Sequence, residues 1–525
     1  MATVAESMSE FKSDVDVNNL PDRISQAVLS RARRQPSHPC LVDSERTLDY
    51  AGLVSAIEEC KTFLTGHQVG PGDRVLLIAE NSITLVAFMM ATSELNAWAV
   101  PVNSRLTDYE IRNIADDCQP RIIIYTTAVS VTAAQHADAM NHSLTTSLPT
   151  AGTFRHSDVQ TDAVAEPVSA AAEEQVFALI YTSGTTGKPK GVMLTHGNVL
   201  FAATQSGSIR RLSKDSFVFA ALPMSHSFGL TSCALATLIY GGSLYLEPKF
   251  SAATCLQTLL QGGITLFMGV PPMYSSLIDE IKRRSVNISE LKLTYLFIGG
   301  ASLDMETKRY IEGVFGMPLH NGYGLTETSP TVAALPYYVQ LNNLSCGPAI
   351  PGIEVKLIDP DGNEIHDGEI GELWTRGPHV MKGYYNKPEL TAQVLQDDGW
   401  LNTQDLARMD ENKNLFIVGR TKELIIRSGF NVYPAEVEAA INEHDSVLQS
   451  AVVGVKSDNN ESVVAFVQLS EGLYVSDEEL REFCKERLSP YKVPSTFVFL
   501  DTLPASGTGK ILKASLSKMA QEAIS

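Results

Sequence analysis

A run of ten residues after a predicted strand carries the side chains best suited to phosphate chemistry. Residues 182–191 have the sequence TSGTTGKPKG and follow the apolar run 176–181. Glycines let backbone N–H groups turn toward one point, while hydroxyls and lysines add donors and positive charge, which together suit a polyphosphate. Gly184 and Gly187 are three residues apart and Pro189 follows Lys188. This spacing departs from G-x-x-x-x-G-K-[ST] and disfavours an ordinary P-loop NTPase, although a Gly/Thr surface loop would have the same composition.

A second cluster combines an aromatic side chain, hydroxyls and a carboxylate in a glycine-punctuated loop. Residues 321–330 have the sequence NGYGLTETSP. The face of Tyr323 can stack on a purine, and a carboxylate such as Glu327 can hold Mg²⁺, a hard cation that prefers oxygen ligands. Taken alone, the segment would also fit common turn chemistry.

Two further clusters lie toward the C-terminus. Asp405 and Arg420 flank a predicted hairpin, and Lys422 and Gly429 lie where the chain enters its last predicted domain. Their charge content alone would favour a solvated linker. Lys510 follows two glycines in the segment PASGTGK, near the C-terminus. In isolation such a segment would most often be a disordered tail.

The order and spacing of these four clusters resemble the ANL superfamily of adenylating enzymes, which comprises acyl-CoA synthetases, peptide-synthetase adenylation domains and beetle luciferases. YTSGTTGKPKG, YGLTETSP, the TQD…GR…SGFNVYPAEVE stretch and GTGK follow the family's order, so the likeness covers essentially the whole chain. The sequence is most similar to the acyl-CoA synthetase branch. One departure is Gln404, because the family usually has Thr-Gly-Asp at residues 403–405. The tighter turn that glycine permits is therefore in question.

The resemblance implies a role for each matching position. The implied phosphate loop is Thr182, Ser183, Gly184, Thr185, Thr186, Gly187 and Lys188, and it continues to Lys190. Tyr323 is implied as the adenine platform, Thr326 as a ligand of the α-phosphate, and Glu327 as the Mg²⁺ ligand. Asp405 and Arg420 are implied to hold the ribose hydroxyls, Lys422 to be the hinge of a mobile small domain, and Gly429 to line a CoA tunnel. Lys510 is implied to bridge the substrate carboxylate and the α-phosphate.

The chemistry explains why these residue types are needed. A carboxylate must approach an anionic triphosphate, and two like charges about 4 Å apart repel by roughly 4 kcal/mol at an effective dielectric of 20. Mg²⁺ and Lys510 would neutralise that charge where it develops. We therefore expect an AMP-forming ligase that uses ATP, Mg²⁺ and CoA. A ligase that loads a separate acyl carrier protein, and a non-catalytic nucleotide-binding relative, remain alternatives.

The resemblance also implies which residues line the acyl pocket and would select the acid. They are His226, Gly299, Gly300, Ala301, Gly324 and Thr328. Residues 216–246 contain no Asp, Glu, Lys or Arg, so a buried ammonium group would lack a partner there. We predict an uncharged acyl group, a medium- or long-chain fatty acid, with an aryl acid as the alternative because a flat ring also fits a glycine-walled slot.

Composition limits the broader class of protein. The 525 residues carry a net charge of −19, which makes nucleic acid an improbable partner. The seven cysteines are scattered without C-x-x-C spacing, so neither a disulfide framework nor a zinc site is expected, and a reducing cytoplasm fits best. No signal peptide is evident, and Pro and Gly interrupt the apolar stretch 216–246, which favours a buried core over a membrane span.

The elements that must position these residues follow from hydrophobic patterning. Apolar, β-branched runs predict buried strands, with a helix over 82–95. The predicted strands are 74–79, 98–102, 121–125, 176–181 and 293–298. Residues 149–174 are expected to form a surface connection. Hairpins are expected at 361–362 and 410–414, and an amphipathic helix at 477–488. The fold class is α/β: a large N-terminal domain (1–421) of layered, mostly parallel sheets with helices and a small β-barrel-like unit (about 335–420), then a small mobile α+β domain (422–525).

Overall fold

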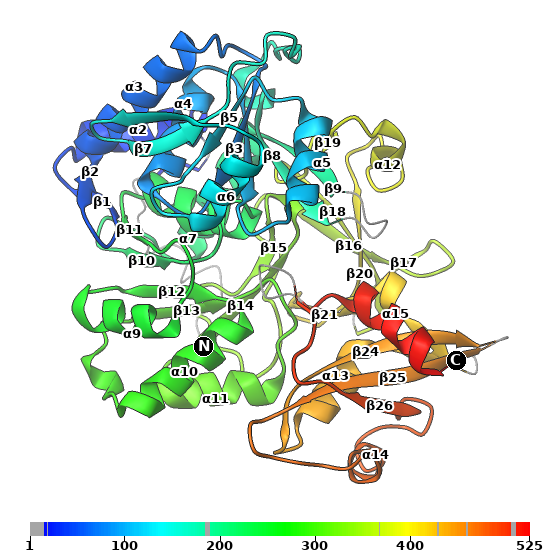
Figure 1. Cartoon of the computed structure of the whole chain (residues 1–525). Coiled ribbons are helices and arrows are strands. Elements are labelled where there is room, and N and C mark those ends of the chain that lie inside the picture. The colour runs from blue at the N-terminus through cyan, green and yellow to red at the C-terminus, as the bar shows by residue number, and fades with distance from the viewer. Residues whose placement is uncertain are drawn as a thin grey trace.

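The computed structural model describes residues 15–17, 19–183, 189–366, 368–427, 430–457, 460–505 and 511–524. Two large sheets with their helices form the N-terminal body, a smaller sheet lies beside them, and the C-terminal segment packs as a separate layer of strands and helices (Figure 1). This arrangement confirms the predicted fold class.

The first large sheet has the strand order β19-β9-β8-β4-β3-β5-β7-β6. Its central pairs are parallel, with Leu76 of β3 opposite Val100 of β4. Both faces of β3 are buried, since Val75 and Leu77 pack in one hydrophobic cluster and Leu76 and Ile78 in another. The strands are β3 (Arg74–Ala79), β4 (Trp98–Asn103), β5 (Ile122–Tyr125), β6 (Leu144–Leu148), β7 (Gly152–His156), β8 (Val176–Ser183), β9 (Pro189–Thr195) and β19 (Gly383–Tyr384).

The second large sheet has the order β15-β14-β13-β12-β10-β11-β1-β2 and is parallel from β14 to β1. Its strands are β1 (Pro39–Val42), β2 (Thr47–Asp49), β10 (Phe217–Ala220), β11 (Ser243–Leu246), β12 (Leu266–Gly269), β13 (Tyr295–Ile298), β14 (Leu319–Gly324) and β15 (Thr331–Ala334). Together the two sheets confirm all five predicted strands and the parallel βαβ arrangement.

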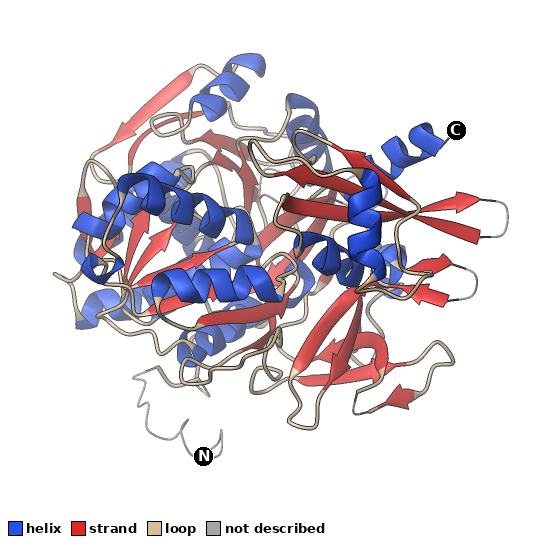
Figure 2. Cartoon of the chain, turned by 90° about the horizontal axis from the view of Figure 1, so that it is seen from below, coloured by secondary structure: helices blue, strands red, loops and turns tan. Residues whose placement is uncertain are grey.

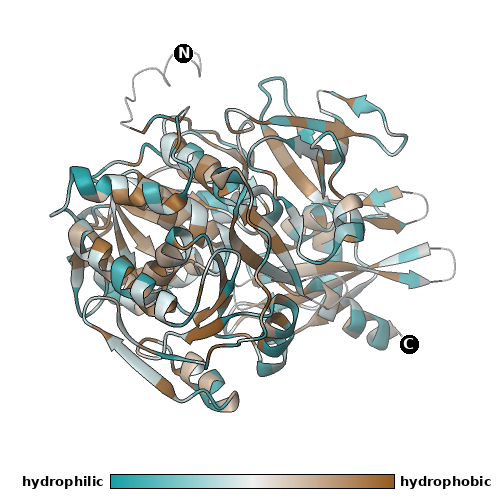
Figure 3. Cartoon of the chain, turned by 90° about the horizontal axis from the view of Figure 1, so that it is seen from above, coloured by the Kyte–Doolittle hydropathy of each residue, from teal (hydrophilic) through white to brown (hydrophobic). Residues whose placement is uncertain are grey.

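Helices cover the faces of both sheets, as the view in Figure 2 shows. The helix predicted over 82–95 is α4 (Ile83–Glu94), in which all residues but the last are buried. The other helices of this body are α2 (Ile24–Arg34), α3 (Tyr50–Gly66), α5 (Asp108–Cys118), α6 (Val131–Ala139), α7 (His196–Ile209), α9 (Ala252–Gln261), α10 (Pro271–Arg284) and α11 (Met305–Phe315). In Figure 3 the strands are largely brown while teal gathers on outer helices and loops, consistent with cores between the layers.

The charge-free stretch 216–246 is mostly buried, as predicted, although His226 within it is exposed, and its helix is unusual. It contains β10, a π-helix η2 (Phe228–Leu235), the short helix α8 (Ala236–Ile239) and β11. Wider π-helical turns often occur at functional sites. Among the described residues, no helix is both long enough and apolar enough to cross a bilayer.

The expectation for residues 149–174 is wrong in part. Residues 152–156 form β7, which pairs with β6 and β5 and extends the first sheet. Phe154 and His156 are buried there, whereas Arg155 between them is half-buried and Thr153 before them is exposed. This period of two spans only five residues, three of them polar, so composition concealed a short edge hairpin.

The small β unit is a five-stranded antiparallel sheet with the order β17-β16-β18-β20-β21. Its strands are β16 (Glu354–Ile358), β17 (Glu364–Ile365), β18 (Ile370–Arg376), β20 (Leu401–Met409) and β21 (Leu415–Arg420). Both predicted hairpins are confirmed, since Gly362 lies between β16 and β17 and residues 410–414 connect β20 to β21. The short helix α12 (Pro388–Ala392) precedes β20.

The C-terminal segment has its own core on both faces of a three-stranded sheet. Alternate residues of β24 face opposite sides: Val452 packs toward α13 and α14, whereas Val453 packs toward α15. The helix predicted at 477–488 is confirmed as α14. The elements are η5 (Thr421–Glu423), β22 (Ile425–Arg427), β23 (Phe430–Val432), α13 (Pro434–Asn442), β24 (Val447–Ser457), β25 (Asn460–Leu469), α14 (Asp477–Lys485), β26 (Thr496–Phe499) and α15 (Lys513–Ile524).

Candidate active site

Three of the predicted nucleotide-binding side chains meet around one buried carboxylate. The Tyr323 hydroxyl, from β14, donates a hydrogen bond to Oδ2 of Asp405 at 2.5 Å. Arg420 Nε lies 3.1 Å from Oδ1 of the same carboxylate. Asp405 is only 4% exposed, so water has little access to its charge and these two groups help to stabilise it. This ring-plus-carboxylate arrangement could stack a base and accept hydrogen bonds from sugar hydroxyls.

The pKa values in this cluster reflect the shared carboxylate. Burial, followed by the charge of Asp405, raises the pKa of Tyr323 well above its ordinary value. Burial, the largest single influence, would lower the pKa of Arg420, but the charges of Asp405 and of its other acidic neighbours together outweigh it and the pKa is raised. Tyr323 therefore stays a neutral donor and Arg420 stays a cation at physiological pH.

Gln404 forms the turn that the resemblance assigned to glycine. Its φ is +59°, in the left-handed region. Its N–H donates to Asn402 Oδ1 at 2.7 Å, and the next N–H, of Asp405, donates to Thr403 Oγ1 at 3.1 Å. These bonds hold the Asp405 carboxylate in place although a side chain at left-handed φ is strained.

The predicted metal ligand Glu327 is oriented by a tyrosine that the sequence analysis did not single out. The Tyr384 hydroxyl donates to Glu327 Oε1 at 2.8 Å, and the Met381 N–H donates to the Glu327 carbonyl at 2.9 Å. Tyr384 lies in β19 and is mostly buried. In sequence it is one of two tyrosines in KGYYN and carries no signal that distinguishes it from a core residue. Thr326 Oγ1 accepts a hydrogen bond from Ser227 Oγ at 3.4 Å, which joins this loop to the start of the π-helix.

The candidate phosphate loop connects β8 to β9. Thr182 lies opposite Lys190 in this antiparallel pair, and Ser183 lies opposite Pro189. Gly184, Thr185, Thr186, Gly187 and Lys188 lie outside the described residues. The Lys190 Nζ is 5.0 Å from the centre of the Tyr384 ring, so the base of the loop and Glu327 contact the same tyrosine from two sides. The structure thus brings Glu327 close to the strand that carries the phosphate loop.

The chemistry of this site suits Mg²⁺ held jointly by protein and nucleotide. The described residues contain no cluster of three or more His, Cys, Asp and Glu side chains able to hold a metal alone. Mg²⁺ commonly takes one or two carboxylates and completes its shell with water and substrate phosphates. Glu327 beside the phosphate-loop strand matches that arrangement.

Two aromatic rings back the glycines of the predicted acyl pocket. A Cβ added at Gly299 would lie 3.4 Å from the Phe297 ring and 3.7 Å from the Phe228 ring. One added at Gly300 would lie 4.0 Å from Phe228. Ala301 directly follows Gly300, and His226 lies two residues before Phe228. Both residues are exposed. Because residues 299 and 300 have no side chains, parts of the Phe297 and Phe228 rings stay uncovered.

Two other predicted pocket residues have clear packing roles. A Cβ at Gly324 would lie 1.7 Å from the Pro330 carbonyl oxygen, so only glycine fits. The hydroxyl of Thr328 is fully buried and donates to that same carbonyl at 2.6 Å. Both residues hold the loop 324–330 closed on itself, which fixes Thr326 and Glu327 within it.

The predicted hinge lies at the exit from the small β unit. Lys422 is exposed in the single turn η5, directly after β21. Within the C-terminal layer, Lys513 of α15 pairs with Glu423 at 3.2 Å and with Glu438 at 2.7 Å. These pairs tie the residue after Lys422 to α15. Gly429 and Lys510 lie outside the described residues.

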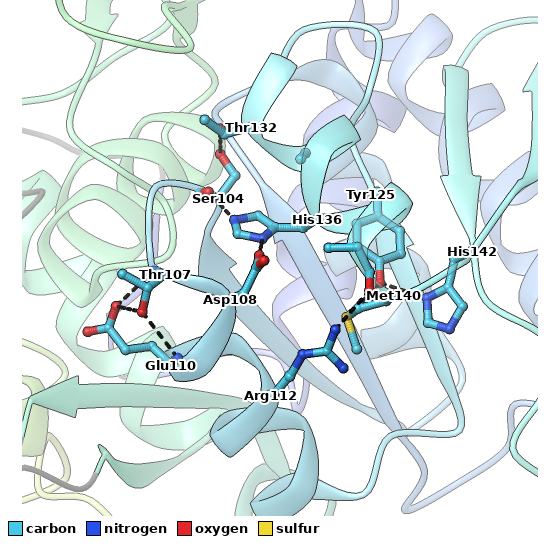
Figure 4. Close-up of polar contacts among 12 residues, drawn as sticks. Ser104, Thr107, Asp108, Glu110, Arg112, Tyr125, Thr132, His136, Met140 and His142 are labelled. Atoms are coloured by element: carbon cyan, nitrogen blue, oxygen red, sulfur yellow. Dashed lines mark hydrogen bonds and ion pairs between the residues drawn. The ribbon is translucent and has the colours of Figure 1, made fainter.

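A second polar cluster lies at the ends of β4 and β5 (Figure 4). His136 Nδ1 contacts the Asp108 carboxylate, while its Nε2 lies 2.8 Å from the backbone carbonyl of Ser104. The Ser104 hydroxyl instead contacts Thr132 Oγ1 at 2.9 Å. Because the imidazole does not reach the serine hydroxyl, this is not a Ser-His-Asp nucleophile, and the hydrogen bonds fasten α5 to α6.

Comparison with known proteins gives a consistent picture. A family model described as AMP-binding enzyme matches residues 28–385, and its C-terminal domain matches residues 436–510. A feruloyl-CoA synthase from Amycolatopsis sp is 33% identical over 493 residues, covering 93% of this chain and 97% of the relative. A long-chain-fatty-acid–CoA ligase from Escherichia coli O157:H7 is 30% identical over 554 residues, covering 97% of each.

Among solved structures, o-succinylbenzoate coenzyme A synthetase from Bacillus subtilis, in complex with ATP and a magnesium ion, superimposes with a TM-score of 0.79. It is 29% identical to this chain, and the match covers 93% of this chain and 98% of that one. These matches agree with the ATP and Mg²⁺ expected from the sequence.

Proposed function

Because the chain belongs to the AMP-binding enzyme family of the ANL superfamily and is an AMP-forming acid–CoA ligase, we propose that it activates a medium- or long-chain fatty acid. The observation that carries the choice of an apolar acid is the charge-free, buried stretch 216–246. It contributes the loop and π-helix beside Gly299 and Gly300.

The reaction has two steps at one site. A carboxylate oxygen attacks the α-phosphorus of ATP, and pyrophosphate leaves. The CoA sulfur then attacks the acyl carbon of the adenylate, and AMP leaves. Mg²⁺ would neutralise phosphate charge in the first step. Tyr323 would stack on the adenine, and Asp405 with Arg420 would hold the ribose hydroxyls. Thr326 would bind the α-phosphate, and Glu327 would hold the Mg²⁺ beside the phosphates.

The second step requires a rearrangement of the C-terminal segment. We propose that residues 422–525 rotate against residues 1–421 about Lys422, so that Lys510 serves adenylation and Gly429 borders the thiol path. The exposed turn at Lys422 supports a hinge, since few packing contacts oppose a backbone change there. Lys422→Pro would fix φ at one hinge residue. It should slow thioester formation more than adenylation, and equal rates of both steps in the variant and the parent would contradict the hinge.

Lys510 can be tested by separating the half-reactions. Lys510→Ala should lower adenylation by about a hundredfold to a thousandfold, as loss of one charged donor at a transition state commonly does. Thioester formation from a supplied acyl-adenylate should be spared. An equal loss in both half-reactions would contradict the assigned role.

An aryl acid is the second candidate, because relatives named for both classes match over nearly the whole chain. CoA is the proposed acceptor, which relatives named as CoA ligases support, and an acyl carrier protein is the alternative. We also propose a cytoplasmic location, which the seven buried, unpaired thiols support.

A panel of fatty, aryl, dicarboxylic and amino acids, followed by pyrophosphate release and by thioester formation, tests the substrate. For fatty acids, each buried methylene should contribute up to about 0.8 kcal/mol, so efficiency should climb with length and then level. If catalytic efficiency does not change with chain length and cinnamate analogues are used efficiently, the result would favour an aryl acid as the substrate. Efficient pyrophosphate exchange with a free amino acid would contradict the charge argument.

A further inference from the structure

A buried cation lies behind the predicted acyl pocket. Arg210 follows α7 and is 2% exposed, and its guanidinium lies 4.3 Å from the centre of the Phe297 ring. Its Nη1 reaches the carbonyls of Ser206 and Ser232 at 3.4 and 3.3 Å, while its Nε has no hydrogen-bond partner. Within the described ranges no Asp or Glu pairs with it, so burial lowers its pKa.

Unpaired or weakly paired hydroxyls surround this cation. Ser206, Ser232 and Thr331 form a triangle with Oγ–Oγ distances of 3.1 to 3.2 Å. All three are at most 5% exposed. The Tyr295 hydroxyl is buried and lies beside the Arg210 guanidinium, and the hydroxyl of Thr231, the residue before Ser232 in the π-helix, is buried without a hydrogen-bond partner. A guanidinium enclosed among neutral hydroxyls and carbonyls is unusual, because buried charges in folded proteins are nearly always paired with an opposite charge.

The polar group is separated from the glycines of the acyl pocket by a pair of rings. Phe297 and Phe228 lie edge to face with centres 5.8 Å apart, and both face the position of a side chain at Gly299. Arg210 lies against Phe297, and Ser232 belongs to the π-helix that Phe228 begins. From the glycines inward, the order is therefore open backbone, aromatic pair, then guanidinium and hydroxyls.

We propose that this group, built around Arg210, is the distal end of the acyl site and that the preferred acid carries an oxygen acceptor at the end remote from its reacting carboxylate. A hydroxyl or a second carboxylate would supply that oxygen. It would accept from Arg210 Nε and from the hydroxyls beside it. This inference rests on the proposed acid–CoA ligase function and adds to it the chemistry of the acid's far end.

The inference is compatible with an otherwise apolar acid. Residues 216–246 supply carbonyls and hydroxyls but no charge, and the cation enters from α7, just outside that stretch. A site built to hydrogen-bond a substrate oxygen rejects an analogue lacking it far more strongly than a hydrophobic pocket rejects one methylene. Discrimination between matched acids is therefore a sensitive readout.

The test compares matched acids with the wild-type enzyme. Each set contains a parent acid, its ω-hydroxy derivative and its ω-carboxy derivative, across a ladder of straight chains and for cinnamate with its para-hydroxy and para-carboxy forms. We expect one oxygenated member to exceed its parent in kcat/KM by about tenfold or more at one length, because Arg210 is fixed in depth. The hydroxy and carboxy arms identify the source of the oxygen.

Variants then assign the preference to Arg210. Arg210→Met should abolish the ratio between oxygenated and parent acids, and Arg210→Lys should retain part of it. Arg211→Met is the matched control, since Arg211 lies over the rings of Tyr337 and Tyr338 instead, and it should keep the ratio. If Arg210→Met does not fold, the ratio of kcat/KM between oxygenated and parent acids in the wild-type enzyme still tests the inference.

Equal efficiencies within every matched set, or a ratio unchanged in a folded Arg210→Met, would overturn the inference and make Arg210 a structural cation only. That outcome would leave the ligase function intact. If cinnamates exceed fatty acids as a class, the fatty-acid proposal fails, but the ratio within each set still tests the distal site.

Discussion

Removal of one hydroxyl, in Tyr384→Phe, should weaken the use of Mg²⁺ without disturbing the fold. The Tyr384 hydroxyl donates to Glu327 at 2.8 Å and its ring lies 5.0 Å from Lys190 Nζ. Phenylalanine keeps the ring, its packing and its contact with the lysine. Only the hydrogen bond that orients the candidate metal ligand is lost.

The expected size follows from the kind of bond. Hydrogen bonds to charged groups contribute about 1.5–3 kcal/mol. Tyr384 is 7% exposed, so water has little access to replace its hydroxyl, whereas Glu327 is only partly buried and can gain some hydration. Each 1.36 kcal/mol corresponds to a factor of ten in rate. We therefore expect kcat/KM for adenylation to fall about ten- to hundredfold at limiting Mg²⁺ and to recover partly at high Mg²⁺.

Tyr385→Phe is the matched control. Tyr385 is the next residue, is 5% exposed, and donates to Glu166 at 2.6 Å, a carboxylate on the connection between β7 and β8. The assay is pyrophosphate release across a Mg²⁺ titration, with saturating acid and with ATP varied below its KM so that kcat/KM is measured. If the two variants have the same Mg²⁺ dependence, Tyr384 does not act through Glu327 and the reasoning is refuted.

Three further outcomes follow. Gln404→Gly should raise the free energy of unfolding by up to about 1 kcal/mol in a urea titration, because φ of +59° strains a side chain, whereas Gln404→Ala should not. The seven cysteines should react with Ellman's reagent only after denaturation, since all are buried and burial raises the pKa of Cys346 to about 12. Burial lowers the pKa of His379 to about 4, so the unfolded chain takes up this proton first as pH falls below 6.5. Between pH 6.5 and 4 this residue should lower the free energy of unfolding by at most about 3 kcal/mol. His379→Gln should remove that share of the drop, whereas His196, whose pKa burial lowers to about 3, should keep its own share.

The secondary structure was predictable where one periodicity dominated. Residues 74–79 are apolar throughout and lie in a strand buried on both faces, so the pattern and the structure agree. Residues 152–156 form the strand next to the sheet edge, in which only Phe154 and His156 are buried, and polar composition concealed it. The π-helix had no sequence signal, because its wider turn depends on packing between α7 and the second sheet.

The candidate site was predictable only as separate motifs. The turn at 410–414 predicted the hairpin that places Asp405 opposite Arg420 on paired strands, whereas the ion pair between them was found only in the structure. The hydrogen bond from Tyr323 to Asp405 joins residues 82 apart, and only the assembled sheets bring them together. Tyr384 depends in the same way on the pairing of β19 with β9.

The charge of a pocket is set by every element that faces it, and this limits what one segment can reveal. Residues 216–246 lack charge, which favours an apolar acid, yet the π-helix within them presents Ser232 to a guanidinium that belongs to the preceding helix. Arg210 is only six residues before that stretch, but its proximity to Phe297 depends on how α7 packs against β13. A segment without charges therefore describes one wall. The proposed selectivity for oxygenated acids would come from the opposite wall, to which Arg210 belongs.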